Sequence, residues 1–492
     1  MSSAALAGLQ PSALWRHFGD LAGIARPPRG EAAALDHIRA WAAGLGLPCE
    51  PAGGANLLVR VPASDGSEAA PTVVVQAHVD MVCEREPGSP RDPARDGVRP
   101  VLDGDWLGAD RTTLGADDGI GVAAMQALAE SETAHGPLEL LFTTAEEVGL
   151  EGAGELDGDA VRGRLLLNLD GEEEGVLTIG CAGATDATIA LAGARTATSA
   201  RERALAVTTS GGTGGHSGFD IADGRANALK VLALCLREAR ADGALRLASF
   251  DGGVSRNAIP REARALLVVA AEESQRVHTA LETAGRAARR LYASTDPSLE
   301  LTVAAAERPD RAWSPGDTGT MVDTVVALPQ GPIVTSPHVA GAVETSLSLG
   351  SASSRGEELA LHGLVRSSSP GALPAVLGSL DALARLAGAR FEVGHSYPAW
   401  RPDPASPLLA VCRATWRDLF GEAPRVSVTH AGLEPALIGR RIPAMDMLST
   451  GPRIESPHSP AERVSVSSVE RWWRFLLTTL AALSRADGPP GP

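Results

Sequence analysis

The stretch TVVVQAHVD, residues 72–80, decides the fold, because it is a short apolar run that leads into a side chain able to bind a metal, His78. Two more runs of this kind lie in the first third of the chain, at residues 138–144 and 165–169. All three are rich in Val, Leu and Thr and are flanked by turn residues. Each run is therefore predicted to form a buried strand.

Acidic side chains follow the second and third runs. Glu146 and Glu147 come just after the second run, and Asp170 follows the third. In an open α/β sheet, ligands bind at the carboxyl ends of the strands. A His, a Glu pair and an Asp delivered to that edge by separate strands predict a metal site, and with it an enzyme.

Length and charge narrow the class of protein. A chain of 492 residues exceeds what one hydrophobic core usually supports, so two or more domains are expected. The formal net charge of −16 argues against binding to nucleic acid or to an anionic membrane, since both need a basic surface. The N-terminal residues do not resemble a secretory signal, and no run approaches the ~18 apolar residues of a membrane span.

The cysteines and the single lysine exclude several kinds of site. The five cysteines are scattered and form neither a CxxC zinc pattern nor a disulfide framework, which predicts a reducing cytoplasm. Lys230 is the only lysine and lies in a predicted helix. A phosphate-binding P-loop or a Schiff-base lysine is therefore not expected.

The order of elements predicts three segments: a catalytic domain in two parts, residues 1–186 and 396–492, and an inserted domain, residues 187–395. Up to about residue 185, strands and helices alternate, which predicts an α/β domain with a mostly parallel sheet and helices on both faces. The insertion is expected to be α+β, with helices on one face of a sheet, and could hold two copies of a small unit. Helices are predicted at residues 30–43, 119–129, 225–239, 272–293 and 465–484, and a long surface loop at residues 84–113.

The candidate ligands have ordinary explanations when each is taken alone. A single HxD such as that of His78 is common, and Asp117, in LGADDGIG, could simply cap a helix. The Glu146–Glu147 pair is less ordinary, because one acid can bind a metal while the other acts as a general base. Zinc takes His, Asp and Glu ligands, and a two-metal hydrolytic site shares a bridging carboxylate. Together these residues favour a metal site that needs one further His.

Several longer strings stand out through nearly the whole chain. They are QAHVDMV, DGDWLGADRTTLGADDGIG, FTTAEEVGLEGA, LLNLDGEEEGVLTIGCAGA, GGHSGFDI, HAGLE and GPRIESPHSPAERV. In content and order they resemble a known family, the zinc-dependent dipeptidases and aminoacylases that include carnosinase, and within it the subgroup of aminoacyl-histidine dipeptidases.

The resemblance implies two bound metal ions, with zinc expected and cobalt or manganese also tolerated. One ion would be held by His78 and Asp170 and the other by Glu147 and His458, with Asp117 bridging the two. His458 lies in the string SPHSP and does not stand out by spacing.

The resemblance also implies roles around the metals. Asp80 would orient His78, and Glu146 would be the general base. The inserted domain would be a lid that binds substrate through His216, Asn257 and Arg366. His216 would stabilise an oxyanion and Arg366 a carboxylate. Without the resemblance, GGHSG could be a flexible turn and Arg366 a surface residue of a strand.

Two positions depart from the family pattern. Asp118 follows the expected bridging acid where relatives often carry Asn, and Ala145 precedes the Glu pair where they often carry Asp. Neither is an expected ligand, although the charge of Asp118 could alter metal affinity.

The resemblance implies a cytoplasmic two-metal hydrolase, expected to be a homodimer. Its substrate would be an unblocked dipeptide, preferably Xaa-His and carnosine-like, attacked by metal-bound hydroxide. The alternatives are an aminoacylase or another short-peptide peptidase, and a catalytically silent homologue that only binds metal.

Overall fold

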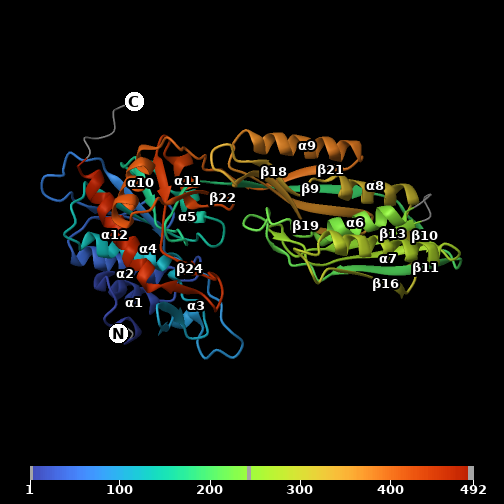
Figure 1. The fold of residues 1–492 in the computed structure, drawn as a ribbon, viewed down its shortest axis with the longest axis horizontal. Coiled ribbons are helices and arrows are strands. Elements are labelled where there is room, and N and C mark those ends of the chain that lie inside the picture. Colours follow the sequence, from blue (N-terminus) through green and yellow to red (C-terminus); the bar gives the residue numbers. More distant parts are fainter. Residues whose placement is uncertain (1–3, 241–244, 486–492) are drawn as a thin grey trace. The chain divides into compact units, whose positions relative to one another are not determined.

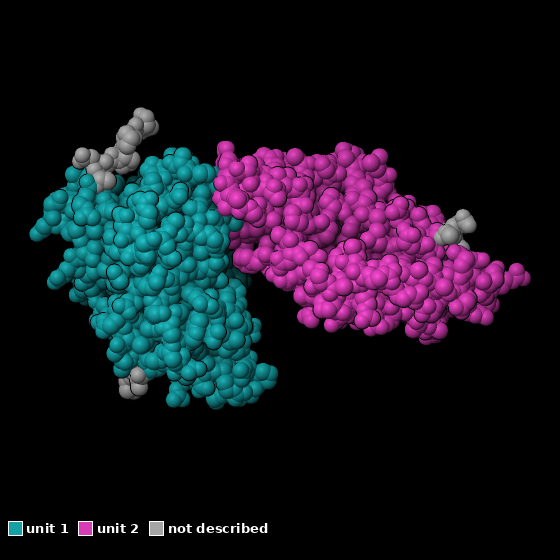
Figure 2. Space-filling model, viewed as in Figure 1, with its two compact units in different colours: residues 1–180, 402–428, 433–492 teal, residues 181–401, 429–432 magenta. Residues whose placement is uncertain are grey.

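The computed structural model describes residues 4–240 and 245–485. The chain forms two compact units, coloured separately in Figure 2. Unit 1 comprises Met1–Gly180, Pro402–Val428 and Leu433–Pro492, and unit 2 comprises Cys181–Arg401 and Thr429–Gly432. The boundaries expected from the sequence, after residues 186 and 395, each lie six residues from these limits, at 180 and 401.

Unit 1 is built on a mixed eight-stranded sheet, and among its strands β22 (Arg425–Thr429) is labelled in Figure 1. In spatial order the strands are β1 (Cys49–Pro51), β2 (Leu57–Val61), β6 (Leu138–Thr143), β3 (Val73–His78), β7 (Leu165–Asn168), β23 (Asp446–Ser449), β8 (Val176–Cys181) and β22 (Arg425–Thr429). The four central strands, β6, β3, β7 and β23, are parallel. β1, β2 and β8 pair with their neighbours in antiparallel fashion.

Every residue of β3, β6 and β7 is buried. Because successive side chains of a strand point to opposite faces, both faces of the central sheet must be covered. The helices of unit 1 are α1 (Ser12–Ala22), α2 (Ala32–Gly44), α3 (Pro93–Asp96), α4 (Ala116–Ala129), α5 (Glu151–Glu155), α10 (Pro407–Phe420), α11 (Glu434–Arg441) and α12 (Val466–Leu483), with short 3₁₀ turns at Ala4–Leu6 and Gly158–Ala160. The predicted α/β class is confirmed.

The expected surface loop at residues 84–113 is a wrong prediction. This segment contains α3 and an antiparallel hairpin, β4 (Pro100–Asp103) and β5 (Trp106–Ala109). The hairpin continues into β25 (Arg463–Ser465) and β24 (Ile454–Glu455) to give a four-stranded sheet. The strands β4 and β5 were missed because each is only four residues long and contains one buried residue, so they show little apolar periodicity.

Unit 2 contains a nine-stranded sheet whose pairings are all antiparallel. Its strands in order are β16 (Glu300–Ala306), β11 (Glu202–Ser210), β15 (Ala263–Ala270), β13 (Leu245–Gly252), β19 (Val343–Arg355), β20 (Glu358–Ser367), β9 (Gly183–Ala192) and β21 (Arg390–Tyr397), with β18 (Gly331–Thr335) also beside β19. Two small ladders join β10 (Arg195–Ala197) to β17 (Arg311–Trp313), and β12 (Gly215–His216) to β14 (Ala258–Ile259).

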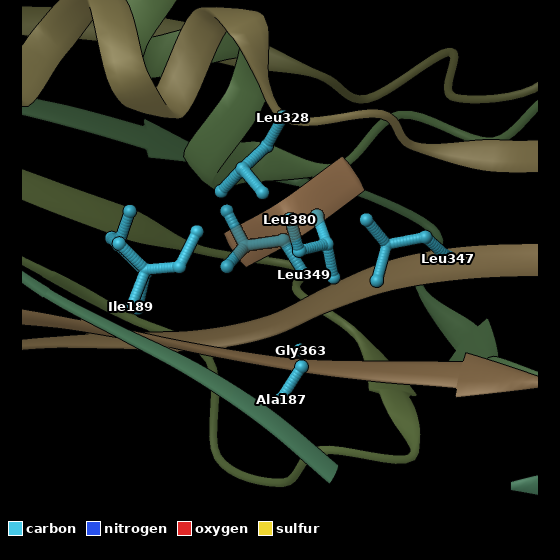
Figure 3. A pocket seen from close by; sticks show the side chains of 8 residues that line it. Ala187, Ile189, Leu328, Leu347, Leu349, Gly363 and Leu380 are labelled. Carbon is cyan, nitrogen blue, oxygen red and sulfur yellow. The ribbon is translucent and has the colours of Figure 1, made fainter. Parts of the chain in front are cut away.

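Four helices cover one face of this sheet and share a single apolar core with it: α6 (Ala228–Ala239), α7 (Ser274–Leu291), α8 (Pro315–Ala327) and α9 (Ala372–Leu386). The predicted inserted α+β domain is thus confirmed. Figure 3 shows a small void in this core, lined by Ala187, Ile189, Leu328, Leu347, Leu349, Leu361, Gly363 and Leu380. Its lining is apolar throughout, so the void is a packing defect with no polar group to orient a ligand.

The described residues, 4–240 and 245–485, include no helix that is both long enough and apolar enough to cross a bilayer.

Candidate metal centre

His78 is the last residue of β3 and is almost completely buried. Its Nδ1 lies 3.1 Å from the backbone oxygen of Asp80 and 3.6 Å from Asp80 Oδ1. A ring hydrogen on Nδ1 would be donated through this contact, and Nε2 would then be the atom that can bind a metal. Nε2 faces two carboxylates, with Asp117 Oδ1 at 3.0 Å and Asp170 Oδ1 at 3.7 Å.

Asp117 lies between two imidazoles. One of its carboxylate oxygens is 3.0 Å from His78 Nε2, and the other is 3.0 Å from His458 Nε2. The residue belongs to the turn into α4, where Asp117 and Asp118 have non-helical backbone angles. An acid that reaches both histidines at once has the geometry of a bridging ligand.

His458 stands in the turn between β24 and β25, with the left-handed φ of 60°. Its Nε2 is also 3.1 Å from Glu147 Oε2. The other carboxylate oxygen of Glu147 is buried without a hydrogen-bond partner. Five side chains expected to bind metal therefore converge, although they come from positions up to 380 residues apart (458 − 78).

The three strand ends meet because β6, β3 and β7 are adjacent and parallel. Asp80 ties two of them together: its Oδ1 and Oδ2 accept the backbone N–H groups of Glu146 at 3.0 Å and Glu147 at 3.1 Å. Asp80 therefore positions both the imidazole of His78 and the backbone of the Glu pair.

The donor set fits divalent ions. Two ligand atoms about 2.1 Å from one tetrahedral ion lie about 3.4 Å apart. Four pairs among these five side chains, each between an imidazole nitrogen and a carboxylate oxygen, are 3.0 to 3.7 Å apart. His78, Asp117 and Glu147 form one group of possible ligands, and His78, Asp118 and Asp170 form another. Imidazole nitrogens with carboxylate oxygens suit zinc, cobalt or manganese.

Burial and nearby acids shift the pKa values of these groups. Hydrogen bonds to Asp117 and Glu147 raise the pKa of His458 to about 11. Burial, reinforced by Asp117 and Glu147, raises the pKa of Asp170 to about 6. Burial also raises the pKa of Glu146 well above its usual range. Positive charge placed among these acids would lower the electrostatic cost of burying them.

Asp118, one of the two departures from the family pattern, is fully enclosed and bonds to backbone. Its Oδ2 accepts the N–H of His78 at 3.3 Å and its Oδ1 accepts that of Gly121 at 3.2 Å. Burial, and then the charges of Asp170 and Asp117, raise the pKa of Asp118 well above its usual range.

Glu434, at the start of α11, was not identified from the sequence. Its fully buried Oε2 accepts hydrogen bonds from Gln76 Nε2 at 2.6 Å and Thr143 Oγ1 at 2.7 Å. Asn168 Nδ2 in turn donates to Gln76 Oε1 at 2.8 Å. This network crosses β3, β6 and β7 just before their ligands. The polar residues Gln76 and Asn168 inside two apolar strands were the available signal.

Unit 2 holds a second polar cluster around Arg366, which is on β20 and 4% exposed. Its Nη1 donates to Tyr397 Oη at 2.9 Å, its Nε lies 3.4 Å from Ser217 Oγ, and its Nη2 lies 3.4 Å from His216 Nε2. Asn257 directly precedes β14 and is exposed. Its backbone oxygen accepts the N–H of Ser217 at 2.7 Å. Tyr397 was not identified from the sequence.

The tautomer of His216 follows from its neighbours. Its Nδ1 accepts the backbone N–H groups of Gly218 at 3.2 Å and Phe219 at 3.3 Å. Burial and the charge of Arg366 lower the pKa of His216 to about 4, so the ring is neutral near pH 7. A neutral ring whose Nδ1 accepts must carry its hydrogen on Nε2. His216 and Arg366 therefore present two donors side by side, as an anionic oxygen requires.

Two sequence comparisons relate the chain to known proteins. The family model for peptidase family M20/M25/M40 matches residues 74–482. The cytosol non-specific dipeptidase of Escherichia coli K12 is 38% identical over 476 residues, which are 96% of this chain and 98% of that protein.

Solved structures share the fold. The crystal structure of aminoacylhistidine dipeptidase from Vibrio alginolyticus matches with a TM-score of 0.88 and 34% identity, over 97% of this chain and 98% of that one. Human carnosine dipeptidase 1 is only 12% identical and matches with a TM-score of 0.51, over 96% of each chain.

Proposed function

The chain belongs to peptidase family M20/M25/M40, and from this premise we propose that it is a metal-dependent dipeptidase. The observation that carries the proposal is the position of Asp117, with one carboxylate oxygen 3.0 Å from His78 and the other 3.0 Å from His458. We assign His78 and Asp170 to one divalent ion, Glu147 and His458 to a second, and Asp117 to both.

The side chains around the ions have separate tasks. Bound divalent ions supply Lewis acidity for water and for the scissile carbonyl. Asp80 holds the Nδ1–H of His78 and the backbone of the Glu pair, which keeps both oriented. Glu146 accepts the proton of the attacking water on its carboxylate and passes it to the leaving amine. A raised pKa suits a group that must both take and give a proton.

His216, Arg366 and Asn257 are proposed to bind substrate. The two parallel donors of His216 and Arg366 match an anionic oxygen, either the oxyanion of the reaction or a free carboxylate. Tyr397 and Ser217 hold the guanidinium of Arg366 from two other sides. Asn257 is placed by the ladder in which its neighbour Ala258 pairs with His216.

The preferred substrate is proposed to be an unblocked Xaa-His dipeptide. The Vibrio alginolyticus relative is named for aminoacylhistidine dipeptides, whereas the Escherichia coli relative is named non-specific. The test is an assay of the metal-reconstituted full chain against Xaa-His dipeptides, other dipeptides and N-acetyl amino acids. Faster cleavage of N-acetyl amino acids would favour an aminoacylase, and bound metal without turnover would favour a silent homologue.

Zinc is the proposed metal, with cobalt and manganese as substitutes. Reconstitution of metal-free protein with each ion, followed by measurement of kcat, compares them. We further propose a cytoplasmic location, since the Escherichia coli relative is called a cytosol dipeptidase. The homodimer is proposed from the resemblance in sequence. Sedimentation velocity of the purified chain tests the dimer, and a monomer at micromolar concentration would contradict it.

A further inference from the structure

Two buried charged side chains of unit 1, Arg26 and Glu462, form hydrogen bonds to the backbone of Gly115. One donates to the residue and the other accepts from it. Arg26 Nη2 donates to the backbone oxygen of Gly115 at 2.6 Å, and Glu462 Oε2 accepts the N–H of Gly115 at 3.0 Å. Arg26 is fully buried and Glu462 is 3% exposed. Gly115 lies two residues before Asp117, the proposed bridging ligand.

Glu462 holds the whole turn that leads to Asp117. Besides Gly115, its carboxylate accepts the N–H groups of Leu114 at 2.8 Å, Ala116 at 2.8 Å and Asp117 at 3.4 Å. The carboxylate thus takes four backbone donors at the start of α4, where negative charge is favoured. This explains how a buried acid is satisfied without an ion pair.

Glu462 also belongs to the turn that carries His458. Its backbone N–H donates to the oxygen of Ser459 at 3.0 Å, and Ser459 Oγ donates to the oxygen of Ser456 at 2.9 Å. His458 has a φ of 60°, which a non-glycine residue keeps only when its surroundings hold it. One carboxylate therefore ties the His458 turn to the Asp117 turn.

Arg26 makes the matching connection to β3. Its Nη1 donates to the backbone oxygens of Val79 at 2.7 Å and Asp80 at 2.9 Å. The guanidinium therefore joins the segment after His78 to the Gly115 turn. The close fit explains the glycine: Gly115 has a φ of 69°, and a Cβ there would stand 2.5 Å from Arg26 Nη2.

We propose that Arg26 and Glu462 are positioning residues that hold Asp117 between His78 and His458 through the Gly115 peptide. Arg26 fixes the position of Asp117 relative to His78, and Glu462 fixes the position of Asp117 relative to His458. Burying two charges is costly, and residues that only stabilised the fold could be replaced by apolar groups at little loss. The inference rests on the proposed function, because it assigns the effect to the two metal ions.

The central variant is Glu462→Gln, which keeps the side-chain size but sets an amide NH₂ against backbone N–H donors. The matched control is Glu139→Gln. Glu139 is 2% exposed, pairs with Arg60 and accepts the N–H groups of Arg162 and Gly163, both at 2.9 Å. It lies near the start of β6, away from the strand ends that carry the ligands. Arg26→Lys is a milder second variant that retains a positive charge.

The measurement is Zn²⁺ binding to the metal-free full chain by competition with a chromophoric chelator. Wild type and Glu139→Gln should take up two ions with the same two affinities. Glu462→Gln should weaken the affinity for one of the two ions at least tenfold. The affinity for the other ion should stay within about threefold of wild type, because the contacts that hold His78 and Asp170 are unchanged. Arg26→Lys should instead weaken the binding of the other ion, the one whose affinity Glu462→Gln leaves nearly unchanged. Equal affinities in Glu462→Gln and wild type would overturn the inference.

Hydrogen exchange of the metal-free proteins separates the inference from the proposed function. Amides of residues 114–117 should exchange faster in Glu462→Gln than in wild type or Glu139→Gln, since their acceptor is impaired. Wild type that binds no Zn²⁺ would refute the proposed function, whatever the exchange shows. Two bound ions with unchanged exchange at residues 114–117 would refute the positioning role alone. If Glu462→Gln does not fold, Arg26→Lys decides by Zn²⁺ binding alone: binding of one ion should be at least tenfold weaker, and two wild-type affinities would overturn the inference.

Discussion

The carboxylate of Glu146 is assigned the transfer of a proton, so its replacement should affect turnover and not metal binding. Glu146→Gln keeps the shape of the side chain but cannot accept a proton. We expect kcat to fall by about 100-fold to 10,000-fold, while both ions stay bound. Metal analysis of the purified variant together with steady-state kinetics tests this. Glu132→Gln, at an exposed position of the same unit, should behave as wild type, and retained turnover in Glu146→Gln would remove Glu146 as the base.

His216 should remain neutral at pH values where a free histidine is charged. Burial and Arg366 lower its pKa to about 4, so the unfolded chain takes up this proton first as the pH falls below about 6.5. Its contribution to stability is therefore complete above pH 6.5 and declines towards pH 4. NMR titration of the imidazole should give a midpoint near 4 in wild type and a higher one in Arg366→Met. A wild-type midpoint near 6.5 would contradict the predicted environment.

At the scale of residues, the sequence predicted side chains that follow strands better than side chains held by distant turns. His78, Glu147 and Asp170 could be predicted because each comes after an apolar run. His458 was found only through the resemblance, since nothing local distinguishes its turn. Glu462 was missed altogether, because its partners are backbone N–H groups 345 to 348 residues away.

At the scale of elements, Lys230 on α6 satisfies the end of α8. Its Nζ donates to the backbone oxygens of Val325 at 2.7 Å, Val326 at 2.8 Å and Leu328 at 2.5 Å. Lys230→Met keeps the aliphatic stem but leaves these carbonyls without the donor and removes the charge that favours a helix C-terminus. We expect a loss of about 1.5–3 kcal/mol in the free energy of unfolding, measured by urea denaturation. Lys230→Arg should lose less, and an unchanged midpoint for Lys230→Met would refute the capping role.

Helices were predicted well where the apolar pattern extended over many residues. The helices expected at residues 225–239 and 465–484 are α6 and α12, with ends within three residues. The hairpin β4–β5 was missed, although Asp103 and Gly104 between two short runs are a turn signal. Strands of four residues with one buried side chain each leave too little apolar pattern in the sequence.

At the scale of the whole molecule, the insertion is not a simple interruption of the chain. Four residues, Thr429–Gly432, belong to unit 2 although the chain on both sides of them belongs to unit 1. The N–H of Ala182 donates to the backbone oxygen of Thr429 at 2.9 Å, which places this excursion in unit 2. A segment of four residues is too short to have a distinctive amino-acid composition, so the sequence could not reveal that it belongs to unit 2.

Because all five proposed metal ligands belong to unit 1, removing the metal should destabilise unit 1 selectively. Without cations the buried acids repel one another, and a ligand present at 1,000 times its Kd adds about 4 kcal/mol of stability. In calorimetry of the full chain, EDTA should therefore lower the midpoint temperature of one unfolding transition. Lys230→Met should lower the midpoint temperature of the other. The two shifts should add in the Lys230→Met protein treated with EDTA, because the two changes act on the cores of separate units. A single transition that moves with both treatments would show that the units unfold together and would contradict this assignment.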